Sequence, residues 1–336
     1  MSDDSVLFLA ADEVAALLQG QEAAVLQAVQ QAYETHGRGD SLMPHSTCLR
    51  FPGGPDRMMA LPAYLGGRFA VAGVKWIASF PGNPGRGLER ASGLVVLSSM
   101  TTGRPTVIVE GSVVSATRTA ASAALAARVL HGATPSPGVG LLGCGVINLA
   151  TLRFLRHLWP ALEPVIVYDL SAARAARFAA RCTAVFERVH VHIVSDPRAL
   201  LERVSLLSIA TTAMEPHLDD LHDGPLRTVL HLSLRDIAPA VIARSDNVVD
   251  DADHVCRAET SLHLAERLLG HRQFIRCALA AILTGEEPPK PAHDVLTIFS
   301  PFGLGILDLA VAQLVYERAV AGGQGRRLPF AATTAA

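Results

Sequence analysis

The sequence predicts an α/β protein in which a doubly wound, mostly parallel sheet is joined to a second domain of the α+β class. Three observations support this prediction: a glycine turn directly after a short apolar run, an alternation of strand and helix patterns from Val139 onward, and a strand-rich stretch between Gly37 and Thr106. Strands that alternate with helices favour a parallel sheet, whereas short runs separated by glycine and proline favour an antiparallel one. A length of 336 residues also suits two domains.

The first 130 residues have the pattern of an α+β domain. Residues 11–36 carry apolar positions at helical spacing with a break near Gly20, which predicts two helices. An alanine-rich segment, 112–130, predicts a further helix. Between them the predicted strands are 49–51, 58–61, 69–79, 93–98 and 106–110.

The second part of the chain has the pattern of a parallel sheet. After a glycine- and proline-rich linker at 131–138, helices separate most of the predicted strands, which are 139–142, 165–168, 189–193, 204–209, 228–232 and 248–249. Near Thr297 the chain is expected to leave the sheet, and 305–321 predicts a long apolar helix that returns to the first domain. The predicted domains are therefore 1–130 with 305–336, for substrate binding and dimerisation, and 131–304, for cofactor binding. The tail after Gly322 is expected to be loose.

Composition and charge argue against several classes of protein. Half of the residues are hydrophobic and 18% are charged, so we expect a large core rather than disorder. A net charge of −2 gives no reason to expect nucleic acid or a membrane surface as a partner. The acidic N-terminus and the lack of an apolar run of about 18 residues predict a cytoplasmic protein. Five widely spaced cysteines without a C-x-x-C motif are expected to be reduced and mostly buried.

The glycine turn Gly143-x-Gly145 predicts a dinucleotide site of the Rossmann type. Such glycines allow a tight strand-to-helix turn and a close approach of the backbone to a pyrophosphate at the helix N-terminus. Asp169 follows the next apolar run, where an acid suits the two ribose hydroxyls. The third glycine of the fingerprint is replaced by Asn148, which we interpret as a tolerated departure. The remaining residues expected to contact the cofactor are Val146, Ile147, Thr211, Thr212 and Ser233.

The expected cofactor is NAD, because Asp169 should repel the 2′-phosphate of NADP. Arg174 and Arg177 follow closely and could soften this preference. Their helical spacing after Ser171 instead predicts that they face solvent.

Several cations lie in apolar surroundings in the first domain. Lys75 falls within a strand-like run and Arg118 near the start of the alanine-rich helix, while Arg50, Arg57 and Arg90 lie in or beside strands. Each could reach solvent or pair with a nearby acid. Because unpaired cations in apolar strands are costly, several together indicate an anionic partner, and the arginine fork suits a carboxylate.

In the second domain, Asp236 follows a predicted parallel strand, at the edge where ligands bind in such sheets. An ordinary surface or capping role is the alternative. His254 and Cys256 lie close together but support no complete metal site, so no metal is expected.

The chain resembles the ornithine cyclodeaminase/μ-crystallin family, and within it the branch of 2,3-diaminopropionate biosynthesis in siderophore and peptide-antibiotic pathways. The motifs that carry the likeness are 61–67 (Leu-Pro-Ala-Tyr-Leu-Gly-Gly), 73–77 (Gly-Val-Lys-Trp-Ile), 79–81 (Ser-Phe-Pro), 89–92 (Glu-Arg-Ala-Ser), 110–122 (from Glu-Gly-Ser to Ala-Ala-Ser, with Arg118), 232–237 (Leu-Ser-Leu-Arg-Asp-Ile) and 246–251 (Asp-Asn-Val-Val-Asp-Asp). They run through most of the chain.

The resemblance implies roles for individual residues. Arg50, Lys75 and Arg118 match residues that hold the substrate α-carboxylate, and Asp236 matches the aspartate that acts as base or water activator. True ornithine cyclodeaminases have Gly-Asp-x-Pro-Gly-Lys around that aspartate, whereas this chain has Arg-Asp-Ile-Ala-Pro at 235–239. This departure argues against cyclisation of ornithine.

The branch resemblance implies NAD-dependent oxidative hydrolysis of N-(1-amino-1-carboxy-2-ethyl)-L-glutamate to 2-oxoglutarate and L-2,3-diaminopropionate. Lys75 and Asp236 would be the catalytic residues, and a homodimer is expected. One alternative is another enzyme of the family, such as an ornithine cyclodeaminase, a ketimine reductase or an N-alkyl amino acid dehydrogenase. The other is a non-enzymatic protein that binds a small molecule, as μ-crystallins do.

Overall fold

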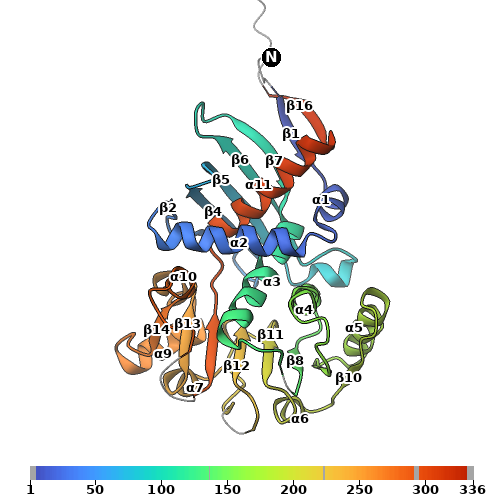
Figure 1. Ribbon diagram of the computed structural model, residues 1–336, viewed down its shortest axis with the longest axis vertical. Coiled ribbons are helices and arrows are strands. Elements are labelled where there is room, and N and C mark those ends of the chain that lie inside the picture. The colour runs from blue at the N-terminus through green and yellow to red at the C-terminus, as the bar shows by residue number, and fades with distance from the viewer. Residues whose placement is uncertain (1–4, 136, 222–223, 291–294, 331–336) are drawn as a thin grey trace, which may run out of the picture. The chain divides into compact units, whose positions relative to one another are not determined.

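The structure, a computed structural model, describes residues 5–135, 137–221, 224–290 and 295–330 (Figure 1). By its internal contacts the chain divides into two units. Unit 1 comprises Met1–Arg118 and Leu304–Ala336, and unit 2 comprises Thr119–Gly303. The boundary at Arg118 falls within helix α3 (Gly111–Leu130), whereas the sequence placed it after the end of this helix. The predicted α/β fold class is confirmed.

Unit 1 is built on one eight-stranded sheet in the order β16-β1-β7-β6-β5-β4-β2, with β3 paired to β4. Its strands are β1 (Ser5–Leu9), β2 (Ser41–Leu42), β3 (Thr47–Arg50), β4 (Arg57–Leu65), β5 (Val71–Ser79), β6 (Ala91–Ser99), β7 (Pro105–Glu110) and β16 (Arg326–Pro329). The pairing is antiparallel except between β1 and β7. The strand-rich texture after Gly37 therefore predicted the central strands, but not β1, β2 or β16.

The prediction of a loose tail is wrong for residues 326–329. This segment forms β16, which pairs with β1 in the register Ser5↔Pro329. All four of its residues are exposed, so the sequence carries no alternating apolar pattern that would mark a strand. Only the backbone pairing with β1 defines it.

Helix α11 (Gly305–Gly322) packs on β4, β5 and β6 and is contacted in turn by α1 (Ala11–Leu18) and α2 (Glu22–Gly37) (Figure 1). Its first eight residues are all buried because the helix has neighbours on more than one side. Gly73 of β5 allows this approach, since a Cβ there would lie 3.0 Å from Leu309 Cδ2. A one-turn 3-10 helix, η1 (Asn83–Arg86), joins β5 to β6.

Unit 2 contains an eight-stranded sheet in the order β10-β9-β8-β11-β12-β15-β13-β14, and every pairing in it is parallel. The strands are β8 (Val139–Leu142), β9 (Val165–Tyr168), β10 (Val191–Ile193), β11 (Leu206–Ile209), β12 (Thr228–His231), β13 (Asp246–Val249), β14 (Ile275–Ala278) and β15 (Thr297–Ser300). The helices are α4 (Val146–Leu158), α5 (Ala172–Val185), α6 (Pro197–Leu201), α7 (Pro239–Ala243), α8 (Ala252–Val255), α9 (Ser261–Leu269) and α10 (Leu279–Thr284).

The sequence missed β14, and the expectation that the chain leaves the sheet near Thr297 is wrong. Residues 297–300 form β15, which is buried throughout and lies between β12 and β13. The run is too short to distinguish from a loop by periodicity. The chain leaves the sheet only after Ser300.

The order of the strands places a topological switch between β8 and β11. From β8 the chain runs outward to β9 and β10, and it then returns to β11 and continues in the opposite direction. In open parallel sheets, ligands bind outside the carboxyl ends of the strands at such a switch. The carboxyl edge of the sheet in unit 2 is therefore where a cofactor is expected.

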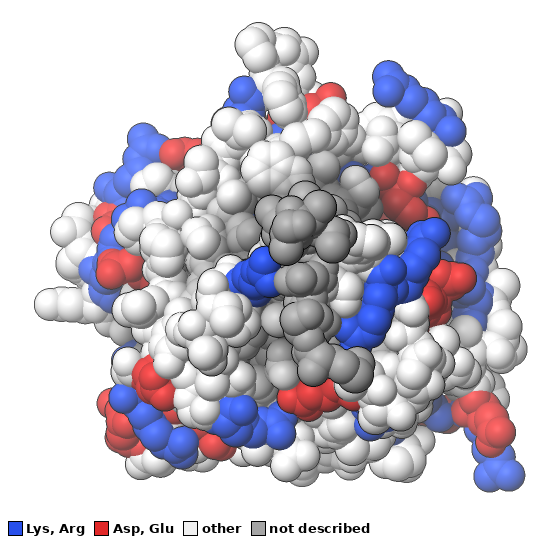
Figure 2. Space-filling model, turned by 90° about the horizontal axis from the view of Figure 1, so that it is seen from above, with Lys and Arg blue, Asp and Glu red and all other residues white. Residues whose placement is uncertain are grey.

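Acidic and basic side chains are interspersed on the face of the molecule in Figure 2, with uncharged residues between them. No helix among the described residues has the length and apolar character needed to cross a membrane.

Candidate active site

Lys75 and Arg118 of unit 1 both contact Asp308, in the first turn of α11. Lys75 Nζ lies 2.5 Å from Asp308 Oδ2, and Arg118 Nε lies 3.1 Å from Asp308 Oδ1. The Ser115 hydroxyl, one turn before Arg118 on α3, accepts hydrogen bonds from both cations at 3.5 and 3.4 Å. All three charged residues are buried. Of the alternatives that the sequence left open, pairing with an acid is the one observed for Lys75 and Arg118.

Two cations on one carboxylate leave this cluster with an excess of one positive charge. Burial is the main cause that lowers the pKa of Lys75, to about 8, and Arg118 adds to the effect while Asp308 opposes it. A second carboxylate would complete the charge balance, because a buried ion needs a partner. The cluster is therefore suited to bind a carboxylate.

Sequence reasoning missed Asp308. It is the single acidic residue in the apolar stretch 305–316, and it is fully buried. An acid within the apolar first half of a predicted helix is the signal that could have identified it.

The other predicted cations gather at one end of the same sheet. Arg50 lies opposite Arg57 in the register of β3 and β4, and Arg57 lies opposite Ser79 of β5. Arg90 Nε lies 3.4 Å from Ser79 Oγ. Burial lowers the pKa of Arg90, and the neighbouring charge of Arg57 adds to this effect. Within the described residues, none of these three arginines has an ion pair with an acid.

The two groups of cations share one face of the sheet. Side chains alternate along a strand, so Ser79 and Arg57 point to the same face as Lys75. Ser79 follows Lys75 by four positions along β5, which corresponds to about 13 Å. Unit 1 therefore presents positive charge at two places on this face.

In unit 2 the turn after β8 has the features of a pyrophosphate site. Gly143 has φ +94°, and a Cβ at this position would collide with the backbone of Ala210. Gly145 precedes α4 with open space around it and no side chain caps the helix, so the first N–H groups of α4 are free to bind an anion. Val146, the first residue of α4, is 51% exposed. These residues fit a dinucleotide.

Asn148 has a definite structural role in place of the third glycine. Its side-chain amide donates to the carbonyl oxygens of Leu142 at 3.0 Å and Gly143 at 2.7 Å. Its Oδ1 accepts a hydrogen bond of 2.7 Å from Ser208 Oγ on β11. Asn148 thus fixes the turn and links it to the neighbouring strand, which is more than the tolerated departure that we inferred.

Asp169 lies at the end of β9 and is held in place by backbone groups. Its Oδ2 accepts from Cys144 N and its Oδ1 from Ser171 N, both at 2.9 Å. Arg174 lies 3.9 Å from Asp169 and its side chain is 54% exposed. The acid thus sits directly beside the glycine turn, as the fingerprint predicts.

Asp236 is fully buried behind two hydroxyl groups. Thr211 Oγ1 donates to Asp236 Oδ1, and Ser233 Oγ donates to Asp236 Oδ2 at 2.5 Å. His231 Nε2 lies 3.3 Å from the same Oδ2. Burial raises the pKa of Asp236, but the neighbouring His231 and the bonds from Ser233 and Thr211 outweigh it and hold the pKa at about 2. Sequence reasoning missed His231.

Thr212, also predicted to contact the cofactor, is exposed.

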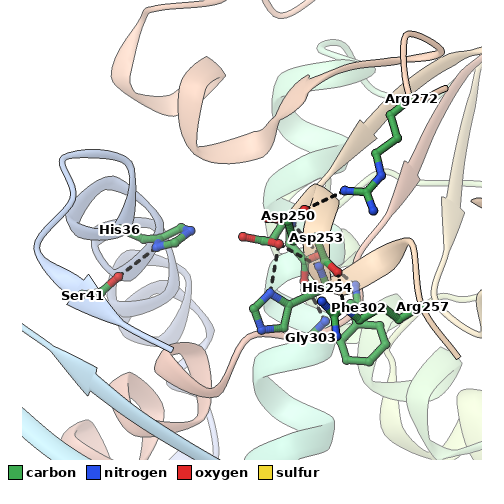
Figure 3. A network of polar contacts seen from close by, with 10 residues as sticks. His36, Ser41, Asp250, Asp253, His254, Arg257, Arg272, Phe302 and Gly303 are labelled. Atoms are coloured by element: carbon green, nitrogen blue, oxygen red, sulfur yellow. Dashed lines mark hydrogen bonds and ion pairs between the residues drawn. The ribbon is translucent and has the colours of Figure 1, made fainter. Parts of the chain in front are cut away.

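Asp250, after β13, ties the ends of two strands together. Its carboxylate accepts hydrogen bonds from Phe302 N at 2.9 Å and Gly303 N at 2.6 Å, on the segment that follows β15 (Figure 3). Burial raises the pKa of Asp250 to about 6, against the opposing effect of these bonds. His254 bonds to Asp251 at 2.9 Å, and the described residues contain no cluster of three or more metal-ligating side chains.

The fold and the sites together define a Rossmann-type nucleotide-binding unit joined to a cationic α+β unit. The chain belongs to the ornithine cyclodeaminase/mu-crystallin family, whose model matches residues 5–323. This family was inferred from sequence motifs and is confirmed.

Three relatives show the range of the family. N-((2S)-2-amino-2-carboxyethyl)-L-glutamate dehydrogenase of Staphylococcus aureus is 27% identical over 303 residues, which cover 88% of this chain and 89% of the relative. The crystal structure of CmnK is 27% identical with a TM-score of 0.86, covering 99% and 100% of the two chains. An archaeal alanine dehydrogenase dimer with bound NAD is 25% identical with a TM-score of 0.85, covering 97% and 100%.

The role of Asn148 leads to a prediction about stability. Replacement with the glycine of the standard fingerprint, Asn148→Gly, removes the acceptor of the Ser208 hydroxyl and the side-chain donor to the Gly143 carbonyl oxygen, whereas the Leu142 carbonyl oxygen keeps the N–H of Ala210. Each buried unsatisfied group costs about 1–3 kcal/mol, so unit 2 should be markedly less stable. Urea denaturation measures this loss, with Asn83→Gly, on the 3-10 turn of unit 1, as the control. An Asn148→Gly protein as stable as the wild type would show that Asn148 is only tolerated.

Proposed function

We propose that this chain is an NAD-dependent oxidoreductase that hydrolyses N-(1-amino-1-carboxy-2-ethyl)-L-glutamate oxidatively, to 2-oxoglutarate and L-2,3-diaminopropionate. The observation that carries the proposal is the pair of cation groups on one face of the sheet in unit 1. A simple amino acid has one α-carboxylate and needs one such group, whereas this conjugate has three carboxylates. The named dehydrogenase of S. aureus supports the same substrate.

The proposed roles follow the location of each residue. Lys75 and Arg118 bind one carboxylate through their excess charge, and Arg50, Arg57 and Arg90 bind the more distant ones. Gly143, Gly145, Val146 and Ile147 hold the pyrophosphate, and Asp169 holds the ribose. The bound NAD would supply the acceptor for the hydride of the α-carbon in the glutamyl part. Asp236 then acts as the base that activates the water, and this water attacks the resulting imine. We further propose that the product supplies siderophore or peptide-antibiotic biosynthesis.

The proposal is tested by incubating the protein with NAD and the conjugate. NADH, 2-oxoglutarate and L-2,3-diaminopropionate should form in equal amounts. Proline and ammonia from ornithine would indicate a cyclodeaminase instead, and NADH consumption with a cyclic imine would indicate a reductase. Oxidation of alanine would indicate the activity named for the archaeal relative. If no substrate is turned over, the alternative of a non-enzymatic binding protein gains support.

Variants should separate binding from chemistry. Arg118→Ala should mainly raise KM, since a cation about 4 Å from a carboxylate contributes roughly 4 kcal/mol at an effective dielectric of 20 before desolvation. Asp236→Asn should mainly lower kcat. Steady-state kinetics with the conjugate provide both constants. Wild-type turnover by Asp236→Asn would contradict the role of Asp236.

Substrate binding should weaken at high pH because the pKa of Lys75 is lowered to about 8. Above this pH the Lys75 ammonium loses its proton. The charge of Arg118 is then balanced by that of Asp308, so the cluster has no excess positive charge. KM should rise by up to about tenfold per pH unit above pH 8. Lys75→Arg keeps its charge and should remove this rise, which also controls for titration of the substrate. A flat KM between pH 7 and 9 in the wild type would contradict the assignment.

Asp169 should determine the preference for NAD over NADP. Asp169→Asn removes the negative charge near the ribose but retains one hydrogen-bond acceptor, so the ratio of kcat/KM for NADP to that for NAD should rise about tenfold, or 1.4 kcal/mol. Arg174→Gln is the matched test of the adjacent cation, and it should lower NADP use in the Asp169→Asn background. An unchanged cofactor ratio in Asp169→Asn would exclude this role.

We also propose that two copies of the chain associate through the sheet face of unit 1 opposite α11. Trp76 lies opposite Leu94 and Ala60 in the sheet register, and Trp76 and Leu94 are 40% and 39% exposed. Exposed apolar patches mark interaction surfaces, and the archaeal relative is described as a dimer. Light scattering should give the mass of a dimer for the wild type and of a monomer for Trp76→Glu. Leu268→Glu, on α9 of unit 2, should remain dimeric. A monomeric wild type would refute the proposal.

A further inference from the structure

A chain of polar side chains leads from the carboxyl edge of unit 2 into its core. Ser233 and Thr211 are partly exposed, whereas Asp236, His231 and Ser300 are fully buried. Contacts run from the Ser233 hydroxyl to Asp236 Oδ2 at 2.5 Å, from Oδ2 to His231 Nε2 at 3.3 Å, and from His231 Nδ1 to Ser300 Oγ at 3.3 Å. A water molecule at the edge would therefore meet the hydroxyls before the carboxylate.

The bonds around His231 define its neutral form. The backbone N–H of Asp236 donates to His231 Nε2 at 3.3 Å, which requires a bare nitrogen at that position. Nδ1 then carries the hydrogen and donates a hydrogen bond to Ser300 Oγ. In this form the one lone pair of Nε2 faces both the N–H of Asp236 and the carboxylate Oδ2, each at 3.3 Å, so a proton on Oδ2 can move to Nε2 only in place of the bond from that N–H.

The pair has no other charged partner among the described residues. Its remaining contacts are the uncharged side chains of Ser233, Thr211 and Ser300, which come from the ends of three different strands. The neighbouring Arg235 donates at 2.6 Å to the carbonyl oxygen of Ala258 instead. A proton that enters this chain is therefore shared by Asp236 and His231.

Beside His231, Asp236 is a weak base, because His231 contributes most of the effect that lowers its pKa. A pKa of about 2 means that its carboxylate holds a proton only briefly at neutral pH. General bases are most efficient when their pKa lies near the working pH, and imidazole is the side chain that titrates in that range. The chemistry therefore calls for a second acceptor next to the carboxylate.

We propose that His231 is a positioning residue that receives, through Asp236 and Ser233, the proton of the water that attacks the imine. This inference rests on the proposed oxidative hydrolysis. His231 touches neither substrate nor cofactor in this role. It acts by keeping Asp236 ionised and ready for the next proton.

The proton transfers balance. The water oxygen bonds to the carbon of the protonated imine, and the electron pair of the C=N bond moves to nitrogen. A proton of the water passes to Ser233 Oγ while the Ser233 proton passes to Asp236 Oδ2 and on to His231 Nε2. The relay returns it to the nitrogen, the C–N bond breaks with its electron pair on nitrogen, and the hydroxyl proton follows as the C=O bond forms. The amine leaves as an ammonium ion.

His231→Gln tests the role in catalysis. Glutamine can still accept the N–H of Asp236 but does not take up a proton at neutral pH. With NAD and the conjugate, kcat should fall at least about tenfold, KM should stay unchanged, and the fall of kcat at acid pH in the wild type should disappear. His131→Gln is the matched control, because His131 also bonds to hydroxyl groups inside unit 2, at Thr228 and Ser205, but lies outside the relay. Equal kcat and an unchanged pH profile in His231→Gln would overturn the proposal.

A second measurement does not depend on the substrate. Nitrogen-15 NMR of histidine-labelled protein with NAD bound, assigned by comparison with His231→Gln, should show a bare Nε2 at pH 8 that gains a proton as the pH falls. A proton on Nε2 throughout would overturn the relay. If the wild type releases no 2-oxoglutarate, the proposed function fails, and the spectrum still decides whether His231 can accept the proton.

Discussion

The contact of Asp308 with Lys75 and Arg118 is the constraint on which unit 1 depends. It joins side chains that are 233 and 190 residues apart in the sequence, on β5, α3 and α11. Loss of one partner from a buried ion pair typically costs about 3–5 kcal/mol, so each segment is held by the other two. The same contact leaves one positive charge uncompensated, and it thus combines a structural role with the capacity to bind an anion.

In unit 2, the polar side chains at the carboxyl edge of the parallel sheet must be held rigidly while the edge stays open to a ligand. Hydrogen bonds from within the unit fix the polar side chains: Asn148 holds the turn after β8, and Asp250 holds the segment after β15. The N–H groups at the start of α4 remain without a side-chain cap. Backbone donors are therefore available at the start of α4, beside the turn that Asn148 holds in place.

Much of this arrangement could be predicted from the sequence, because it depends on local patterns. The strand–turn–helix unit with Gly143 and Gly145, the acid Asp169 and the family all follow from short motifs. The parts that were missed depend on long-range contacts or on short segments. Asp308 acquires its role only through folding, β15 is four residues long, and β16 exists only by pairing with β1. His231 looked like an ordinary residue of a buried strand until Asp236 was placed beside it.

The five thiols differ sharply in their surroundings, and this has a practical consequence. Burial raises the pKa of the Cys144 thiol, within the glycine turn, to about 12, and that of the Cys182 and Cys256 thiols to about 11. Thiolates are the reactive form, so these sites resist alkylation and oxidation. Cys48 is exposed and lies two residues before Arg50. A maleimide dye would therefore react with Cys48 first. It would report on the end of the sheet that carries Arg50, while Cys144 in the glycine turn stays unlabelled.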